Sequence, residues 1–400
     1  MQATAGGKLA VEGGNPVRAS LLPYGRQTIE EDDIAAVAEV LRSDWLTTGP
    51  KVGEFERAFA DFTGATEAVA VSNGTAALHA AVAAIGIQPG DEVIVPPMTF
   101  AATANCVVYE GGKPVFVDVE ADTLLLDPAL LEAAITERTR AIIAVDYAGQ
   151  PADYDAITRI AAKHNLKVIA DASHAIGADA HRRSVGTLAD LTTFSLHPVK
   201  TMTTGEGGVI TTNDSALAQR MRTFRSHGIT SDHRQRESQG SWFYEMVELG
   251  YNYRITDFQC ALGLTQLGKV RGWSERRHEI AHAYDTAFAG SEVIEPLTTR
   301  PNLRHGYHLY VVRLKGALRN RRTEVFAALR AEGIGVNVHY VPVHMHPFYR
   351  RNFGTAAGLA PVSERAYEEI VTLPLFPQMS DNDVHDVVEA VGKVAGSFAP

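Results

Sequence analysis

Short apolar runs alternate with amphipathic stretches through the first half of the chain. The runs are Ala68–Ser72, Glu92–Pro96, Lys113–Val119, Ala141–Tyr147, Lys167–Ala172, Thr192–Leu196 and Gly208–Thr212. Between several of them, apolar residues recur at helical spacing, as in TAALHAAVAAIG (Thr75–Gly86) and ADYDAITRIAAKHN (Ala152–Asn165). Strands that are apolar on both faces and alternate with helices predict an α/β fold with a mostly parallel central sheet, covered by helices on both sides.

Two amphipathic segments precede these strands. Thr28–Glu31 has the pattern of a capping box, and a helix starting there places four apolar residues on one face, Ile34, Val37, Val40 and Leu41. The turn signal Trp45–Lys51 follows, and then a second amphipathic stretch, Phe55–Phe62. The sequence therefore predicts an N-terminal helical segment in front of the sheet.

The last third of the chain has a different pattern. A long helix is expected from about Thr256 to Gly290. Two strand candidates, Tyr307–Leu314 and Val336–Pro342, flank the helix-like stretch Thr323–Gly333. We therefore expect a large α/β domain over residues 1–255, and a long connecting helix with a smaller C-terminal α+β domain over residues 256–400.

Composition and charge narrow the class of protein. The net charge is −10, with acidic and basic residues mixed along the chain, which argues against a nucleic-acid partner. Cys106 and Cys260 are far apart and lack metal-type spacing, as expected of a reduced compartment. No apolar stretch has the length of a signal peptide or a membrane span, so we expect a cytoplasmic protein.

Ligands of such sheets bind at the carboxyl ends of the strands, so the residues that follow the first runs are of interest. Ser72-Asn73-Gly74-Thr75-Ala76 opens a helix after the first run, and its free amides suit a phosphate, although this turn taken alone favours a plain helix cap. Phe100 follows the second run, either as a core residue or as a stacking surface for a ring.

Two later strand ends carry charged residues. Asp171 ends a buried run, where it is either a helix N-cap or a carboxylate that faces a cationic group. Ser195 and Lys200 follow the run Thr192–Leu196 and precede a glycine-rich turn that allows close approach of a ligand to the backbone. A lysine crowded at a strand end is a candidate for a lowered pKa and Schiff-base chemistry, although a single lysine is by default a surface residue.

The order of these features points to one cofactor. Pyridoxal phosphate requires amides and hydroxyls for its phosphate, a cover for its ring face, a carboxylate at its pyridinium nitrogen and a lysine at its aldehyde. The candidates occur in this order along the chain, as Thr75, Phe100, Asp171, Ser195 and Lys200.

The sequence also resembles the DegT/DnrJ/StrS sugar aminotransferases, which are fold-type I (aspartate aminotransferase-like) pyridoxal-phosphate enzymes. The resemblance runs from about Leu22 to the segment LPLFPQMSDND. Its most specific parts are DASHAIGA, FSLHPVKTMTTGEGG, FRSHGI and LGYNYRITDFQCALG. VDYAGQPADYDAI, HLYVV and HYVPVH support it.

The resemblance implies a role for individual residues. Lys200 corresponds to the lysine that forms the internal aldimine, and Asp171 to the carboxylate on the pyridine nitrogen. Asn252 corresponds to an asparagine that reaches the phosphate site of the neighbouring subunit, which implies a homodimer with shared active sites. The other implied cofactor contacts are Thr75, Ala76, Phe100, His174 and Ser195. The expected substrate contacts are Trp45, Thr47, His308 and His339.

The implied reaction moves the amino group of L-glutamate to a nucleotide-linked keto-sugar in a ping-pong cycle and releases 2-oxoglutarate. Within the family, DASHA, VDYAG, RSHGI and the HPVK segment are most similar to transaminases that make UDP-4-amino-4,6-dideoxy-N-acetyl-β-L-altrosamine. The N-terminal KLAVEGGNPVR is instead similar to members that aminate cyclitols or antibiotic sugars. Other keto-sugars, of GDP-perosamine or dTDP-3-keto type, and scyllo-inosose therefore stay open as substrates.

Two further interpretations are weighed against this one. A relative that acts as a sugar 3-dehydratase has histidine in place of the lysine, and Lys200 argues against it. A catalytically silent regulator is less expected because the full residue set is present. The stretch with His339, His344 and His346 could suit zinc, but no cysteine or carboxylate lies near it in sequence, so structural or substrate contacts are expected and no metal.

Overall fold

The computed structural model of the chain describes residues 8–231, 236 and 240–398. Its centre is a seven-stranded sheet in the order β1-β9-β8-β5-β4-β2-β3. Neighbouring strands are parallel except at β9, which runs antiparallel to β1 and β8. The strands are β1 (Glu67–Val71), β2 (Glu92–Val95), β3 (Lys113–Phe116), β4 (Thr139–Val145), β5 (Lys167–Asp171), β8 (Leu191–Ser195) and β9 (Gly208–Thr212). The prediction of a mostly parallel α/β sheet is confirmed.

Both faces of this sheet are covered because successive side chains of a strand point to opposite faces. In β1, Ala68 and Ala70 pack in one core cluster, whereas Val69 and Val71 pack in another. The first cluster includes side chains of α2 (Pro50–Thr63) and α6 (Tyr154–Lys163). The second includes side chains of α3 (Gly74–Ala84), α4 (Ala102–Tyr109) and α7 (Ser215–Arg225).

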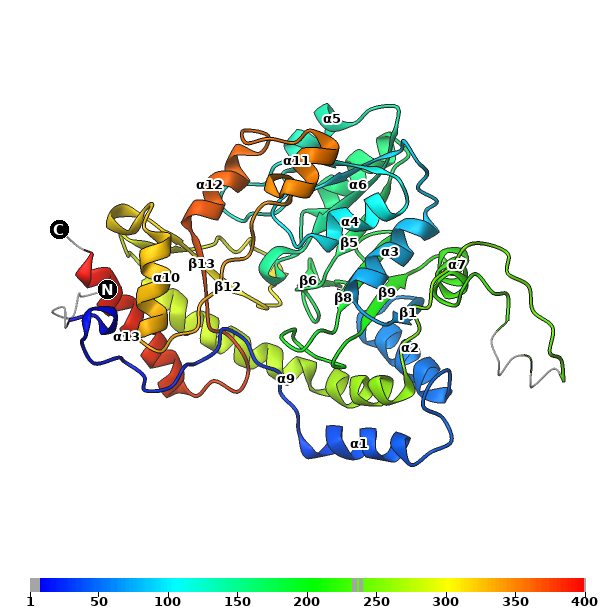
Figure 1. The fold of residues 1–400 in the computed structure, drawn as a ribbon, viewed down its shortest axis with the longest axis horizontal. Coiled ribbons are helices and arrows are strands. Elements are labelled where there is room, and N and C mark those ends of the chain that lie inside the picture. Colours follow the sequence, from blue (N-terminus) through cyan, green and yellow to red (C-terminus); the bar gives the residue numbers. More distant parts are fainter. Residues whose placement is uncertain (1–7, 232–235, 237–239, 399–400) are drawn as a thin grey trace.

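A single long helix, α9 (Asp257–Phe288), connects the two ends of the molecule (Figure 1). It begins with a capping box between Thr256 and Gln259, and its start lies where the sequence predicted it. Its first half contacts α2, and its second half enters a third core cluster. Leu9 and Leu22 from the N-terminal segment also pack in that cluster. The division into domains at residue 255 stays a prediction.

The third cluster lies on an antiparallel sheet of β10 (Ile294–Pro296), β12 (Tyr310–Leu314) and β13 (Ile370–Leu373). The predicted strand Val336–Pro342 is wrong, because β13 occupies the place beside β12 and leaves Asn337 a single bridge to Thr372. Helices complete this region and the rest of the fold: α5 (Leu131–Ala134), α10 (Arg322–Ala331), α11 (Pro347–Phe353), α12 (Pro361–Glu369) and α13 (Asp381–Ser397).

A small third sheet and several short helical turns were not predicted. The sheet joins β6 (Asp179–Ala180), β7 (Arg183–Ser184) and β11 (Leu303–Arg304). His181 and Arg182, which link β6 to β7, both have positive φ, as a two-residue hairpin turn requires. The 3₁₀ turns are Ala10–Glu12, Pro128–Leu130, Tyr147–Gly149, Gly316–Leu318 and Val343–Met345.

The first helix differs from its prediction in register. α1 (Glu31–Leu41) is capped by Glu30, whose partner in the capping box is Asp33, and not by Thr28. Ile34 and Leu41 are exposed. The buried Asp33 accepts hydrogen bonds from Thr265 (2.5 Å) and Gln266 (2.7 Å) of α9. Polar contacts therefore help to hold α1 on α9, and hydrophobic periodicity does not report them.

We expect Phe59→Ala to lower the free energy of unfolding by about 3–5 kcal/mol, because it leaves a cavity in the core between α2 and the sheet. The Phe59 side chain is fully buried, with its ring 5.1 Å from that of Phe194. Urea denaturation followed by tryptophan fluorescence measures the change. Phe62→Ala, at a partly buried position of the same helix, is the matched control and should cost less. Equal losses would contradict this account of the core.

Candidate active site

The predicted chemical residues converge at the carboxyl edge of the parallel strands. β5 ends at Asp171 and its neighbour β8 ends at Ser195. The loop from β8 to β9 carries Lys200. Because parallel strands bring their carboxyl ends to one edge of the sheet, residues far apart in sequence meet there.

Asp171 is held by two hydroxyl groups. Its side chain is almost wholly buried, and its residue is only 5% exposed. One carboxylate oxygen accepts a hydrogen bond from the Thr103 hydroxyl (2.7 Å), and the other accepts from the Ser173 hydroxyl (2.6 Å). These donors satisfy a buried carboxylate and fix its orientation. Sequence reasoning missed Thr103; its signal was a threonine one helical turn after Phe100, in the segment PMTFAAT.

Lys200 lies beside a histidine. Its Nζ is 3.4 Å from Nε2 of His308, a residue predicted as a substrate contact. Burial disfavours the charged ammonium and lowers the pKa of Lys200 to about 8, although the negative charge of Asp171 opposes the shift. About a tenth of this amine is therefore neutral at pH 7, far more than for a lysine in water, and a nucleophile or base requires the neutral form.

His174 and His308 form a neutral pair next to the lysine. Their ring centroids are 4.6 Å apart, and Nε2 of His174 is 2.9 Å from the Tyr340 hydroxyl. Burial and then the charge of Lys200 lower the pKa of both histidines well below the usual range. The Nδ1 atoms of both rings are buried and have no hydrogen-bond partner among the residues that the structure describes. Sequence reasoning did not single out Tyr340.

The predicted phosphate turn is packed against the end of β8. Asn73 caps α3 by accepting a hydrogen bond from the Ala76 amide (2.8 Å), and the Gly74 and Thr75 amides at the start of the helix have no intrahelical acceptor. A Cβ at Gly74 would lie 2.9 Å from Cβ of Ser195. A Cβ at Gly208 would lie 2.4 Å from the Asn73 carbonyl oxygen. Two glycines thus let the turn that contains Thr75 approach Ser195 closely.

These groups fit pyridoxal phosphate. The helix N-terminus with Thr75 and Ser195 offers donors for a phosphate, Asp171 offers a carboxylate, and Lys200 offers an amine. The unpartnered Nδ1 of His174 is available to a polar atom of the cofactor. Phe100, which is 62% exposed, has its ring 6.2 Å from that of Tyr340, and so lies at the margin of the same group of side chains.

Two of the other three histidines of interest contact polar side chains of the protein. The ring of His339 contacts the Thr372 hydroxyl (2.9 Å) and the Asn337 amide nitrogen (3.3 Å), and burial lowers its pKa to about 3. His344 is fully buried and contacts Glu364 (2.9 Å). His346 is only partly buried. Over the residues that the structure describes, no group of three or more His, Cys, Asp and Glu side chains is placed to hold a metal ion.

The remaining predicted residues lie on exposed segments. Trp45 and Thr47 belong to the loop between α1 and α2, and Thr47 forms a bridge with Thr256 at the start of α9. The buried Asp257 holds this loop by accepting from the Gly49 amide (2.7 Å). Asn252 is exposed and bridges to Ser226. Neither Thr47 nor Asn252 is part of the contacts around Lys200 described above.

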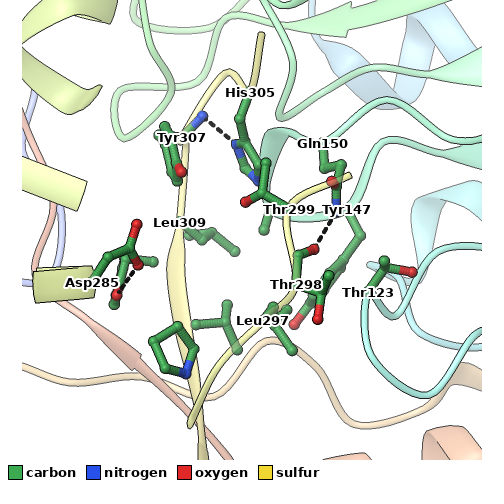
Figure 2. A pocket seen from close by; sticks show the side chains of 14 residues that line it. Thr123, Tyr147, Gln150, Asp285, Leu297, Thr298, Thr299, His305, Tyr307 and Leu309 are labelled. Carbon is green, nitrogen blue, oxygen red and sulfur yellow. Dashed lines mark hydrogen bonds between the residues drawn. The ribbon is translucent and has the colours of Figure 1, made fainter. Parts of the chain in front are cut away.

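A small polar cavity is lined in part by the segment that leads into β12, including Tyr307 and Leu309 (Figure 2). Tyr147, Gln150, His305 and Tyr307 are among its lining residues, and its free volume is about 20 Å³. That is room for about one water molecule and far too little for a cofactor. The Tyr147 hydroxyl donates to the His339 carbonyl, so this cavity borders the site and belongs to its supporting wall.

The fold and the site together define the class of transferases that use pyridoxal phosphate. The sequence model of the DegT/DnrJ/EryC1/StrS aminotransferase family matches residues 27–392, and the chain belongs to this family. It is 44% identical over 377 residues to the spore coat polysaccharide biosynthesis protein SpsC of Bacillus subtilis, covering 94% of this chain and 97% of that protein. It is 40% identical over 384 residues to the UDP-4-amino-4-deoxy-L-arabinose–oxoglutarate aminotransferase of Shewanella sediminis, covering 94% and 98%.

Solved structures agree with this assignment. PseC of Helicobacter pylori, an aminotransferase involved in the biosynthesis of pseudoaminic acid, superposes with a TM-score of 0.89 at 32% identity, covering 94% of this chain and all of that one. The pyridoxal-phosphate form of Spr1654 from Streptococcus pneumoniae gives a TM-score of 0.89 at 34% identity, covering 95% and 100%. The chain is thus a pyridoxal-phosphate-dependent aminotransferase. Among its described helices, none is long and apolar enough to cross a membrane.

We expect the Lys200 amine of the cofactor-free protein to titrate near pH 8, because burial disfavours its charge. Competitive acetylation followed by mass spectrometry should give a reactivity midpoint near that pH, against about 10.4 for a lysine model peptide. In Asp171→Asn the midpoint should move to lower pH, because the carboxylate charge that favours the ammonium is gone. A midpoint near 10.4 in the unaltered protein would contradict the site.

Proposed function

We propose that this enzyme moves the amino group of L-glutamate to a nucleotide-linked keto-sugar. The observation that carries the proposal is the lysine of lowered pKa beside His308 and opposite the hydroxyl-bound Asp171, all at one edge of the sheet. The names of the relatives add the substrate class, because one aminates a UDP-linked sugar with oxoglutarate as counterpart and others serve polysaccharide or pseudoaminic acid synthesis.

We propose a UDP-linked 2-acetamido-2,6-dideoxy-4-keto-hexose, aminated at C4, as the first sugar to test. The similarity to PseC supports this choice over GDP-linked sugars, dTDP-linked 3-keto-sugars and scyllo-inosose. The two substrates bind in turn in a ping-pong cycle, so that 2-oxoglutarate leaves before the keto-sugar enters.

Lys200 is proposed to carry the proton. When bound, pyridoxal phosphate supplies an electron sink for a carbanion at the carbon that loses or gains the amino group. The neutral Lys200 amine removes the proton from the substrate carbon and returns it after the electrons have moved. His308 Nε2, 3.4 Å away and neutral, accepts a hydrogen bond from the resulting ammonium and keeps Nζ in place between the two transfers.

The neighbouring residues are proposed to hold the cofactor. Asp171 would hold the pyridine nitrogen and favour its protonated form, and the Thr103 and Ser173 hydroxyls keep the carboxylate oriented. His174, which contacts Tyr340, would bind the phenolic oxygen. Phe100 would cover the ring, and Ser195 would bind the phosphate together with the turn that contains Thr75 and Ala76.

We also propose a homodimer in which Asn252 reaches the phosphate of the neighbouring subunit. Support comes from the segment 240–251, which directly precedes Asn252. Large apolar side chains are exposed along it, with Trp242 84% and Leu249 76% exposed. A soluble monomer rarely exposes such a stretch, and a second copy of the chain is the occupant that the proposal commits to.

Lys200→Ala should lower the amination rate by about a thousandfold or more, because no other side chain takes over the proton transfer. Glutamate-dependent loss of the absorption band of the bound cofactor, and 2-oxoglutarate release, measure the first half-reaction. Lys163→Ala, at an exposed lysine, is the control and should keep full rates. Undiminished turnover of Lys200→Ala would overturn the assignment.

The sugar substrate is identified by assaying the enzyme against a panel of candidate keto-sugars. The enzyme loaded with glutamate is offered UDP-, GDP- and dTDP-linked 4-keto- and 3-keto-sugars and scyllo-inosose. We expect the highest kcat/KM with the UDP-linked 4-keto sugar, and mass spectrometry of the product gives the aminated species. Preference for scyllo-inosose would replace the nucleotide sugar by a cyclitol.

Shared active sites predict complementation between two defective subunits. Lys200→Ala disables its own site, whereas Asn252→Ala weakens the site of its neighbour. In a mixed dimer both changes fall on one site and the other site is intact. A one-to-one mixture that exchanges subunits should therefore recover about a quarter of the unaltered activity. Recovery no greater than the mean of the two parent variants would contradict the shared site.

A further inference from the structure

A histidine is buried in the middle of α3, inside a group of aromatic rings. His79 is 1% exposed and is surrounded by alanines on its own helix. Its ring lies 4.9 Å from that of Tyr251, 5.1 Å from those of Tyr109 and Phe224, and 5.8 Å from that of Tyr253. An apolar residue would fill this space without burying ring nitrogens. Burying the two nitrogens of His79 costs free energy unless both are hydrogen-bonded.

The ring nitrogens of His79 form a directional chain of hydrogen bonds. Nε2 is 2.6 Å from a carboxylate oxygen of Glu110, and Nδ1 is 3.0 Å from the Tyr253 hydroxyl. Burial lowers the pKa of His79, although Glu110 opposes the shift, so the ring is neutral at neutral pH. A carboxylate only accepts, so Nε2–H donates to Glu110 and Nδ1 is left to accept from Tyr253. The Tyr253 side chain is thereby locked in one orientation.

This lock fixes the direction of Asn252. Asn252 forms a β-bridge with Ser226, and the rings of Tyr251 and Tyr253 on either side of it stack at 5.1 Å, both beside His79. Asn252, between them, must point to the opposite side, and it is exposed there. The backbone is held in the same register, because the Tyr253 carbonyl accepts from Ser72 (2.8 Å) and the Tyr253 amide donates to Arg225 (3.0 Å).

We propose that His79 and Tyr253 are positioning residues that aim Asn252 at the cofactor phosphate of the second subunit. The inference rests on the proposed dimer. His79 lies one turn beyond Thr75 and Ala76 on the same helix, so α3 contributes to its own phosphate site at its N-terminus and to the neighbouring one through His79. Ser72, which bonds Tyr253, directly precedes the cap of that helix. The two phosphate sites of a dimer are thus coupled through a single helix.

A double-mutant cycle on cofactor affinity tests the proposal. The variants are Tyr253→Phe, which keeps the ring and removes only the hydroxyl, Asn252→Ala, and the double variant. Pyridoxal phosphate is titrated into each cofactor-free protein at concentrations where analytical ultracentrifugation shows a dimer, and thermal midpoints are recorded separately. Tyr253→Phe should weaken cofactor binding about fivefold to tenfold, the worth of one neutral hydrogen bond.

The result to examine is whether the effects of the Tyr253 and Asn252 changes on cofactor affinity are additive. If the hydroxyl acts through Asn252, the double variant binds the cofactor no more weakly than Asn252→Ala alone, even though its thermal midpoint falls further. Tyr109→Phe is the control. Tyr109 lies on α4 with its ring beside that of His79, and its change to Phe should leave the cofactor affinity unchanged.

Two results would overturn the proposal, and they distinguish failure of the positioning role from failure of the shared site. Additive losses of affinity in the double variant mean that Tyr253 acts independently of Asn252, while the shared site stands. Unaltered affinity in Asn252→Ala, together with failed complementation between Lys200→Ala and Asn252→Ala, removes the shared site itself.

Discussion

The site depends on burying one carboxylate and one amine at the same edge of a sheet. Asp171 is nearly inaccessible and is stabilised by hydroxyl donors from Thr103 and Ser173. Desolvation lowers the pKa of Lys200 to about 8 while the Asp171 charge limits the fall. Burying either charge alone would cost several kcal/mol of folding free energy. Each charge therefore lowers the free-energy cost of burying the other. The rest of the site keeps this pair oriented.

That constraint accounts for the character of the surrounding residues. A second positive charge near Lys200 would be unfavourable, and the pKa values of His174, His308 and His339 are all lowered by burial and by Lys200. Neutral histidines can bind and orient without repelling the lysine. Tyr340 and Thr372 hold two of these rings. His79 is a second example of a neutral buried histidine that orients its neighbours. Its ring contacts Glu110 and Tyr253 and orders a segment outside the site.

Much of the fold was accessible from local pattern, because buried parallel strands are apolar on both faces. Each of the seven runs became a strand of the central sheet, and the candidates at their ends lie at its carboxyl edge. The failures have physical causes. Val336–Pro342 has strand-like residues, but Ile370–Leu373 takes the position beside β12. α1 packs on α9 through Asp33, a polar contact that hydrophobic periodicity does not detect.

The sequence by itself indicated the class of chemistry, because a helix-opening turn, an aspartate and a lysine each follow an apolar run, and parallel strands bring such residues to one edge of a sheet. Only the tertiary structure decided how they are supported. Thr103 meets Asp171 across 68 residues and His308 meets Lys200 across 108, and no local pattern encodes such contacts. Likewise, the direction of Asn252 follows from the packing of Tyr251 and Tyr253 on His79, which exists only once α3 and the segment after α7 lie together.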